Sequence, residues 1–154
     1  MKHRLLLARI VYIGLLSAVT WVRSAMALEL VTVAEMQTSA AAPEPLTPKT
    51  VTTPGAPQIE IVHPRLDKPV ASPTAIQLMF LPSTSSVVRP ETFKVLYGRL
   101  RIDITQRLTQ VAKITPEGIH VQEASLPKGS HRLMLSIEDV QGRQGMKQLD
   151  FEIK

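Results

Sequence analysis

The chain has 154 residues and no cysteine, which excludes disulfides, thiol catalysis and a lipid-anchoring cysteine. Its 18 Lys and Arg residues exceed its 13 Asp and Glu residues, but Lys2, Arg4, Arg9 and Arg23 all lie in the first 27 positions. Without those four, the balance is 14 basic against 13 acidic residues. The charge therefore gives no support for binding to nucleic acid or to an anionic membrane.

Residues 1–27 have the three-part layout of a secretory signal peptide. A positively charged start is followed by an apolar run over 10–22 and by the small residues Ala25-Met26-Ala27, which predict cleavage after Ala27. The alternative is an uncleaved membrane anchor, but the apolar run is shorter than the roughly 20 residues that cross a bilayer. We expect a periplasmic or secreted protein with no stable membrane span after cleavage.

Residues 28–57 are predicted to form a disordered linker. Residues 28–36 are moderately apolar, and prolines then recur among Ala, Thr and Ser, a composition that cannot bury enough apolar area to offset the entropy of ordering. The alternative is a loop packed on the domain. The stretch 28–33 is either a frayed terminus or a strand that adds to an open sheet edge, in its own molecule or in a neighbour.

Residues 58–154 are predicted to form one domain, because short runs of alternating polarity are separated by turn signals there. One helical turn is expected over 105–110, with Asp103 or Thr105 as its cap. The pattern indicates an all-β fold, an antiparallel β-sandwich of about seven strands. The expected strands are 58–62, 74–81, one marked by Phe93, Val95 and Tyr97, one marked by Leu100, Ile102 and Ile104, 119–124, 131–137 and 149–153.

The stretch LPKGSHRLMLSIEDVQGRQGMKQLDFEI, at 126–153, resembles the closing hairpin of bacterial immunoglobulin-like and fibronectin type III-like modules. In those modules a Pro-x-Gly turn leads into a strand, and an Asp-x-x-Gly turn leads into a last strand that ends near an aromatic residue. The resemblance implies an immunoglobulin-like sandwich of the looser bacterial kind, without the cysteine pair and core tryptophan of antibody domains. The residues that carry it are Pro127, Gly129, Asp139, Gly142, Gly145 and Phe151.

Three arginines lie close together in the middle of the domain. If the apolar residues of the fourth expected strand face the core, Arg99 and Arg101 stand on its outer face, and Arg107 extends the patch. One interpretation is a solvated face with weak ion pairs. The other is a patch that binds a carboxylate-bearing partner, because a guanidinium can bind a carboxylate through two hydrogen bonds. Arg99, Arg101 and Arg107 are therefore the candidate partner-binding residues.

Three histidines of the domain raise the question of metal binding, because exported sandwiches of this kind include copper carriers. They are His63, His120 and His131. The strands that hold His120 and His131 are expected in opposite sheets, so we predict no metal site and no cofactor. A periplasmic copper-binding carrier of the immunoglobulin-like type remains the alternative function.

No motif of an enzyme is present in the sequence: it lacks a Gly-rich phosphate loop, a nucleophile elbow and HExxH. Asp139 is expected to bond its own backbone in a turn, and Glu138 points to the opposite face. We predict a non-catalytic exported module, binding or structural, that contacts an envelope or extracellular protein, or a cell-wall polymer, through exposed strands and loops. The longest loops, 81–90 and 105–118, are its expected contact surfaces.

Overall fold

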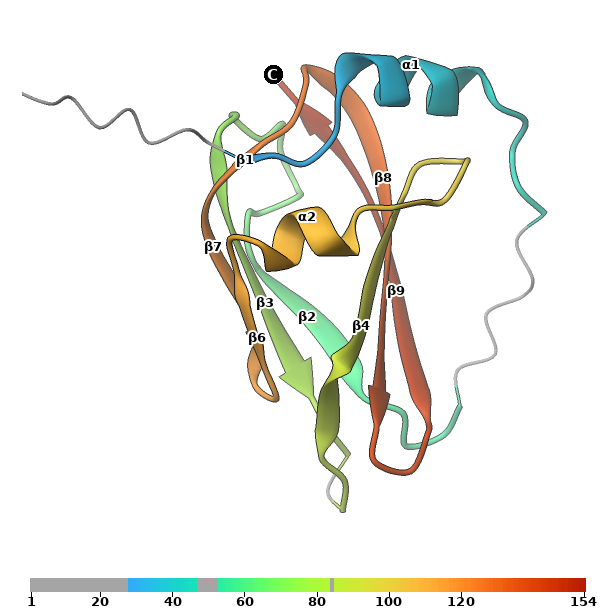
Figure 1. The fold of residues 1–154 in the computed structure, drawn as a ribbon, viewed down its shortest axis with the longest axis vertical. Coiled ribbons are helices and arrows are strands. Elements are labelled where there is room, and N and C mark those ends of the chain that lie inside the picture. The colour runs from blue at the N-terminus through green and yellow to red at the C-terminus, as the bar shows by residue number, and fades with distance from the viewer. Residues whose placement is uncertain (1–27, 47–52, 84) are drawn as a thin grey trace, which may run out of the picture.

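The structure is a computed structural model, and it describes residues 28–46, 53–83 and 85–154 (Figure 1). The predicted signal peptide, 1–27, lies outside the described residues. None of the helices in the described residues has the length and apolarity of a membrane span. The elements are β1 (Leu28–Glu29), α1 (Val33–Ala41), β2 (Gln58–His63), β3 (Thr74–Leu81), β4 (Val88–Tyr97), β5 (Ile102–Asp103), α2 (Thr105–Thr109), β6 (Lys113–Thr115), β7 (Gly118–Ser125), β8 (Gly129–Asp139) and β9 (Gln144–Ile153).

Two sheets pack face to face as a β-sandwich, so the all-β prediction is confirmed. One sheet has the order β2-β3-β7, and the other has the order β5-β4-β8-β9. Because β3 pairs along one edge of β7, the other edge of β7 is shared by two short strands. There, β6 pairs near the start of β7, with Lys113 opposite His120, and β1 pairs at its end, with Leu28 opposite Ala124.

The core lies between the sheets, on the faces that the period-two pattern predicts. In β8 every second side chain from His131 to Ile137 is buried, because successive strand residues point to opposite faces. From β9, Leu149 and Ile153 join the same core, and Phe151 is half-buried. The rings of Phe80 and Phe93 meet across the sheets, with centroids 5.5 Å apart.

The fourth predicted strand is wrong in extent. Only Ile102–Asp103 form β5, and Leu100 is 49% exposed instead of facing the core. The cause is a turn after β4, in which Gly98 and Arg101 both have positive φ, 64° and 52°, and the amide of Arg101 donates to the Gly98 carbonyl. Arg99 and Arg101 therefore belong to this turn and not to the outer face of a strand.

Helix α2 confirms the predicted helical turn, but its N-cap residue is Ile104, which forms no side-chain capping hydrogen bond. Asp103 Oδ1 accepts a hydrogen bond from the amide of Thr105 at 2.9 Å, which satisfies one of the free N–H groups at the helix start. Hydrogen bonds from the Thr105 side chain and backbone also lower the pKa of Asp103. Buried Ile104 and Leu108 fix α2 against the sandwich, so most of the predicted loop 105–118 is ordered structure.

Residues 28–46, which we call the N-terminal arm, are folded where the sequence analysis expected a disordered linker over 28–57. Leu30 and Val31 are 2% and 0% exposed and form part of the core. Helix α1 then starts at a capping box, in which the Thr32 hydroxyl accepts from the Glu35 amide and the Glu35 carboxylate accepts from the Thr32 amide. Residues 47–52 of the predicted linker lie outside the described residues.

The arm also adds a strand to a sheet edge, one of the alternatives that the sequence left open for 28–33. Leu28 and Glu29 pair in parallel with Ala124 and Ser125 of the same chain. The amide of Leu30 continues the ladder by donating to the Ser125 carbonyl at 3.0 Å. In this structure the added strand belongs to the molecule's own sheet.

Candidate binding groove

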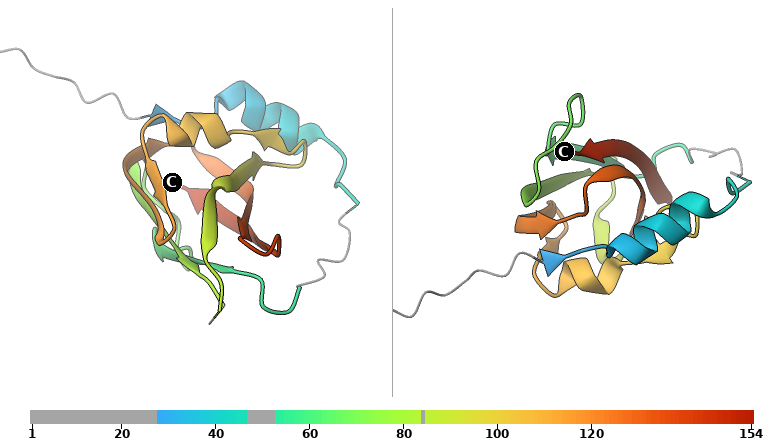
Figure 2. Two further views of the ribbon diagram at one scale, coloured as in Figure 1. Left: turned by 60° about the horizontal axis from the view of Figure 1, so that its bottom comes forward. Right: turned by 90° about the horizontal axis from the view of Figure 1, so that it is seen from above.

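Arg107, one of the three predicted binding residues, holds the start of α1. Its guanidinium donates to both carboxylate oxygens of Glu35, at 2.8 and 2.6 Å, and to the Leu30 carbonyl at 3.0 Å. Figure 2 shows α1 and α2 side by side, the two helices that this ion pair joins. The hydrogen bonds from Arg107 hold the pKa of Glu35 at about 2, well below its usual value.

Arg99 holds the other end of α1. Its guanidinium donates to the carbonyls of Ala40 and Ala42, both at 2.9 Å, and its amide donates to Ser39 Oγ at 2.8 Å. The last carbonyls of a helix lack partners within the helix and attract cations, and α1 has no basic residue in its own last turn. Arg99 supplies that cation from the turn after β4.

Gly98 allows α1 to approach this turn closely. Its φ of 64° is a conformation that side chains disfavour. A Cβ atom on Gly98 would lie 1.9 Å from Ser39 Oγ, well inside contact distance. Both the backbone conformation and the close approach of the helix therefore require glycine here.

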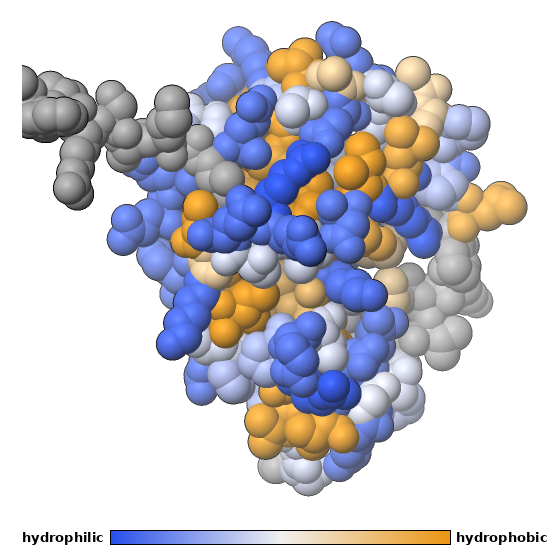
Figure 3. Space-filling model, in the orientation of Figure 1, coloured by the Kyte–Doolittle hydropathy of each residue, from blue (hydrophilic) through white to orange (hydrophobic). Residues whose placement is uncertain are grey.

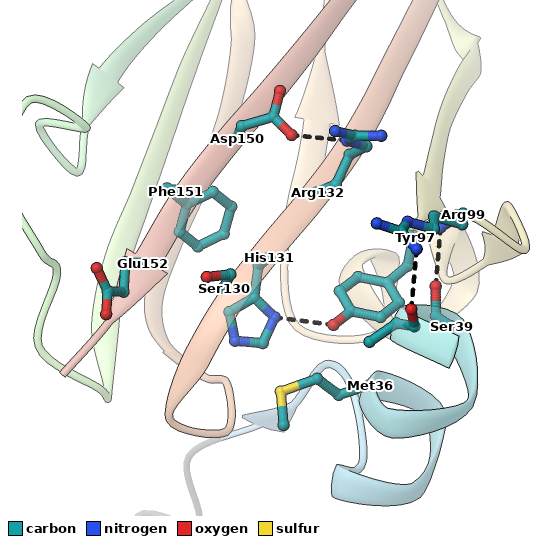
Figure 4. A pocket seen from close by; sticks show the side chains of 12 residues that line it. Met36, Ser39, Tyr97, Arg99, Ser130, His131, Arg132, Asp150, Phe151 and Glu152 are labelled. Atoms are coloured by element: carbon teal, nitrogen blue, oxygen red, sulfur yellow. Dashed lines mark hydrogen bonds and ion pairs between the residues drawn. The ribbon is translucent and has the colours of Figure 1, made fainter. Parts of the chain in front are cut away.

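A groove of about 400 Å³ lies between α1 and the sheet at the ends of β4 and β9 and the start of β8 (Figure 4). Arg132 lies at its edge and was not singled out by the sequence analysis. Arg132 Nε donates to Asp150 Oδ1 at 2.7 Å, directly across the β8–β9 pair. The groove lining includes Met36, Ser39, Tyr97, Arg99, Arg132 and Asp150.

Arg99 and Arg132 converge on one carboxylate, that of Glu44 in the N-terminal arm. Glu44 Oε2 lies 3.1 Å from Arg99 Nε, and Glu44 Oε1 accepts from Arg132 Nη1. The third predicted binding residue, Arg101, does not line the groove, and in the described part of the chain it forms no ion pair. The two arginines that the structure brings together at the groove are Arg99 and Arg132.

His131 and Tyr97 form the buried inner end of the groove. The Tyr97 hydroxyl lies 2.9 Å from His131 Nδ1, and His131 Nε2 lies 2.7 Å from the Pro127 carbonyl. Because a carbonyl only accepts, Nε2 carries the hydrogen, and Nδ1 accepts from the hydroxyl. Burial lowers the pKa of His131 and raises that of Tyr97 to about 12, so both side chains are neutral at pH 7 and serve as a structural pair.

The three candidate metal-ligating histidines do not converge. As predicted, His120 and His131 lie in opposite sheets, on β7 and β8. His63 lies in the row of His120, but Gln77 of the middle strand separates them. Among residues 28–46, 53–83 and 85–154, no three His, Cys, Asp or Glu side chains are grouped as a metal site.

Asp139 and Glu138 point to opposite faces of β8, as predicted. Asp139 is fully buried, and its Oδ1 accepts from the amides of Gln141 and Arg143, both at 2.9 Å. Burial alone would raise the pKa of Asp139, but the hydrogen bonds from Arg143 and its neighbours lower it to about 2. Asp139 is therefore an ionised turn residue that closes the β8–β9 hairpin.

The predicted contact loop at 81–90 ends in an apolar tip. Leu81 and Val87 are exposed there. The amide of Val140, in the turn between β8 and β9, donates a hydrogen bond to the Val87 carbonyl at 2.9 Å, and the Val140 side chain is also exposed. Figure 3 shows hydrophobic surface at this end of the molecule. The loop between β3 and β4 lies at the end of the sandwich opposite α1 (Figure 1).

Comparisons with protein-family models, with curated proteins and with solved structures gave no match. The interpretation of the groove therefore depends on its geometry alone. One signal in the sequence could have revealed the folded arm: Thr32 and Glu35 have the spacing of a capping box and follow two apolar residues. No local pattern could have revealed the contact between Glu44 and Arg132, which lie 88 residues apart.

Proposed function

We propose that this chain is a non-catalytic exported module with an immunoglobulin-like sandwich, and that it binds a carboxylate-bearing protein or polymer of the cell envelope at the groove. The signal-like pattern of residues 1–27 supports export. The two arginines that line the groove, Arg99 and Arg132, support a ligand with carboxylates.

The order of strands supports the immunoglobulin-like assignment. If β2 to β9 are labelled A, B, C, C′, D, E, F and G, the two sheets have the orders A-B-E-D and C′-C-F-G. These are the orders of immunoglobulin sheets. Because such sandwiches have many unrelated functions, the fold alone does not indicate a ligand. The ligand class is therefore inferred from the residues of the groove.

The contact of Glu44 with Arg99 and Arg132 is the observation that carries the proposal. Each arginine is oriented by a second partner: Asp150 holds Arg132, and the α1 carbonyls hold Arg99. Each guanidinium therefore presents one nitrogen to a common carboxylate, Arg99 through Nε and Arg132 through Nη1, and charge-assisted contacts of this kind favour a carboxylate ligand. The carboxylate of Glu44 is 55% exposed, so the site is open to solvent and to an external ligand.

A capture experiment with envelope extract tests the proposal. The bait is the chain from Leu28 to Lys154, run beside Arg132→Ser and, as a control with the same loss of charge, Arg101→Ser. We expect a captured component that is lost with Arg132→Ser, is kept with Arg101→Ser, and is released by free polyglutamate. The proposal would be contradicted if all three baits captured the component equally, or if free polyglutamate failed to release it. Protease treatment of the captured material separates a protein ligand from a carboxylated polymer.

A further inference from the structure

The segment that follows α1 sits on the two arginines of the groove as a ligand would. Helix α1 ends at Ala41, and Ala42 has φ −69° and ψ 150°, the extended polyproline II conformation. Pro43 and Pro45 then flank Glu44 on both sides. The occupant of the two guanidiniums is thus a short extended peptide with one carboxylate between prolines.

This segment is lightly held in comparison with the rest of the arm. In the described residues, the ion pairs and side-chain hydrogen bonds that join 43–46 to the sandwich are those of Glu44 with Arg99 and Arg132. Leu46 is 97% exposed. By contrast, the preceding part of the arm has its apolar residues in the core and its helix fixed at both ends by arginines.

The contacts of Arg99 also limit where the arm can open. Because Arg99 donates to the carbonyls of Ala40 and Ala42, it fixes the chain up to the end of α1. Release of Glu44 would therefore leave Arg99 and Arg132 in place, with their guanidiniums still oriented by Ala40, Ala42 and Asp150. The site would be empty and already shaped for another carboxylate.

We infer that residues 43–46 are an internal ligand of the groove, and that the external ligand is an extended acidic peptide that displaces Glu44 from Arg99 and Arg132. This inference rests on the proposed function, and it names both the ligand class and its regulation. The internal carboxylate competes with the external one at high effective concentration, because Glu44 follows by two residues Ala42, whose carbonyl Arg99 already holds. Ion pairs between exposed groups are weak, so this competition lowers the affinity without closing the site.

The expected strength of the competition follows from the exposure of the pair. An exposed ion pair contributes up to about 1 kcal/mol, which corresponds to about a fivefold change in an equilibrium constant. Removal of the Glu44 carboxylate should therefore tighten binding of an acidic peptide by up to about fivefold. Glu60, an exposed residue of β2 that does not line the groove, provides a matched control, because its neutralisation changes the net charge equally without releasing either arginine.

The test is a fluorescence anisotropy titration of the chain 28–154 with a labelled peptide of alternating proline and glutamate. Its matched peptide has glutamine in place of glutamate, and polygalacturonate serves as a competitor that presents carboxylates on a glycan. The variants are Glu44→Gln, Glu60→Gln and Arg132→Ser. Glu44 is exposed, so Glu44→Gln should fold normally, and the unfolding midpoint of each variant is measured to check this.

We expect Glu44→Gln to bind the acidic peptide several-fold more tightly than the native chain, Glu60→Gln to bind nearly as the native chain does, and Arg132→Ser to lose binding. Equal affinities of Glu44→Gln and Glu60→Gln, with loss in Arg132→Ser, would overturn the internal-ligand inference and leave the proposed function standing. Binding that Arg132→Ser retains, or the absence of binding by every variant, would overturn both. If polygalacturonate competes with the labelled peptide more strongly than the unlabelled acidic peptide does, the assignment of a peptide ligand would be overturned.

Discussion

Arg107 on α2 and Glu35 on α1 lie 72 residues apart in the sequence and form a two-pronged ion pair with N–O distances of 2.8 and 2.6 Å. The same Glu35 carboxylate caps the start of α1 through Thr32. One side chain thus serves both the local start of the helix and its attachment to the domain. This relationship makes the N-terminal arm part of the folded unit and presents Glu44 to the groove.

The ion pair should be measurable in a double-mutant cycle with Glu35→Gln and Arg107→Met. Each single variant should lower the free energy of unfolding by about 1–2 kcal/mol, because the pair is partly exposed and screened by solvent. The double variant should lose less than the sum, with a coupling of about 0.5–1 kcal/mol, measured by urea denaturation. Strict additivity would show that the two residues do not interact in solution.

The same pair predicts a dependence on acid. The folded-state pKa of Glu35 is depressed from 4.5 to about 2, so its stabilising effect is fully present above pH 4.5 and is lost as the pH falls through about 2. The difference in unfolding free energy between the native chain and Glu35→Gln should shrink over this interval. A difference that stays constant down to pH 2 would contradict the assigned pairing.

Burial of Leu30 predicts that the arm supports the whole domain. Leu30→Ala should lower the free energy of unfolding by about 2–5 kcal/mol, the range for a large core side chain replaced by alanine. Val33, three residues on, is 51% exposed, so Val33→Ala should change stability by no more than about 0.5 kcal/mol. Chemical denaturation of both variants checks this, and similar small effects would mean that the arm is not part of the core.

The contact between Gly98 and Ser39 predicts unequal effects of alanine at two glycines. Gly98 and Gly142 both have positive φ, 64° and 74°, but nothing lies within 4 Å of a Cβ atom added to Gly142. Gly142→Ala should therefore cost only the backbone strain, about 1 kcal/mol. Gly98→Ala should cost clearly more, and Ser39→Ala should recover part of the loss; equal melting temperatures of the two glycine variants would contradict the close approach of α1.

The buried pair of His131 and Tyr97 predicts a second dependence on pH. Burial lowers the pKa of His131 below 6.5. As the pH falls below 6.5, this imidazole therefore binds a proton more readily in the unfolded chain than in the folded chain. Stability from this source is fully present above pH 6.5 and falls as the pH drops through the folded-state pKa. In His131→Gln this part of the slope should disappear, because glutamine does not titrate, whereas His120→Gln, at an exposed position, should keep it.

The sequence predicted those parts of the fold that depend on local periodicity. The alternation from His131 to Ile137 predicted the correct buried face of β8, and the helical turn predicted after Asp103 is α2, although Ile104 is its N-cap residue. The prediction failed near Gly98, where a turn with two positive φ values interrupts an alternating pattern that reads as a strand.

The arm was missed for a different reason. Its proline-rich second half dominates the composition of 28–57, while the capping box of Thr32 and Glu35 and the apolar pair before it occupy only a few positions. The groove could not be predicted even from the capping box, because Glu44 contacts Arg132 only when the sandwich and the arm have both folded. Pairings between residues so far apart in the chain depend on the tertiary structure and leave no local pattern.

The most direct test of the account follows the side-chain Nε–H signals of arginine by NMR while polyglutamate is added to the chain 28–154. We predict that the signals of Arg99 and Arg132 shift first and together, that the signal of Arg101 moves little, and that the shifts weaken as salt screens the charges. Shifts confined to the apolar tip around Val87 and Val140, with Arg99 and Arg132 unchanged, would contradict the central claim that this groove binds carboxylates.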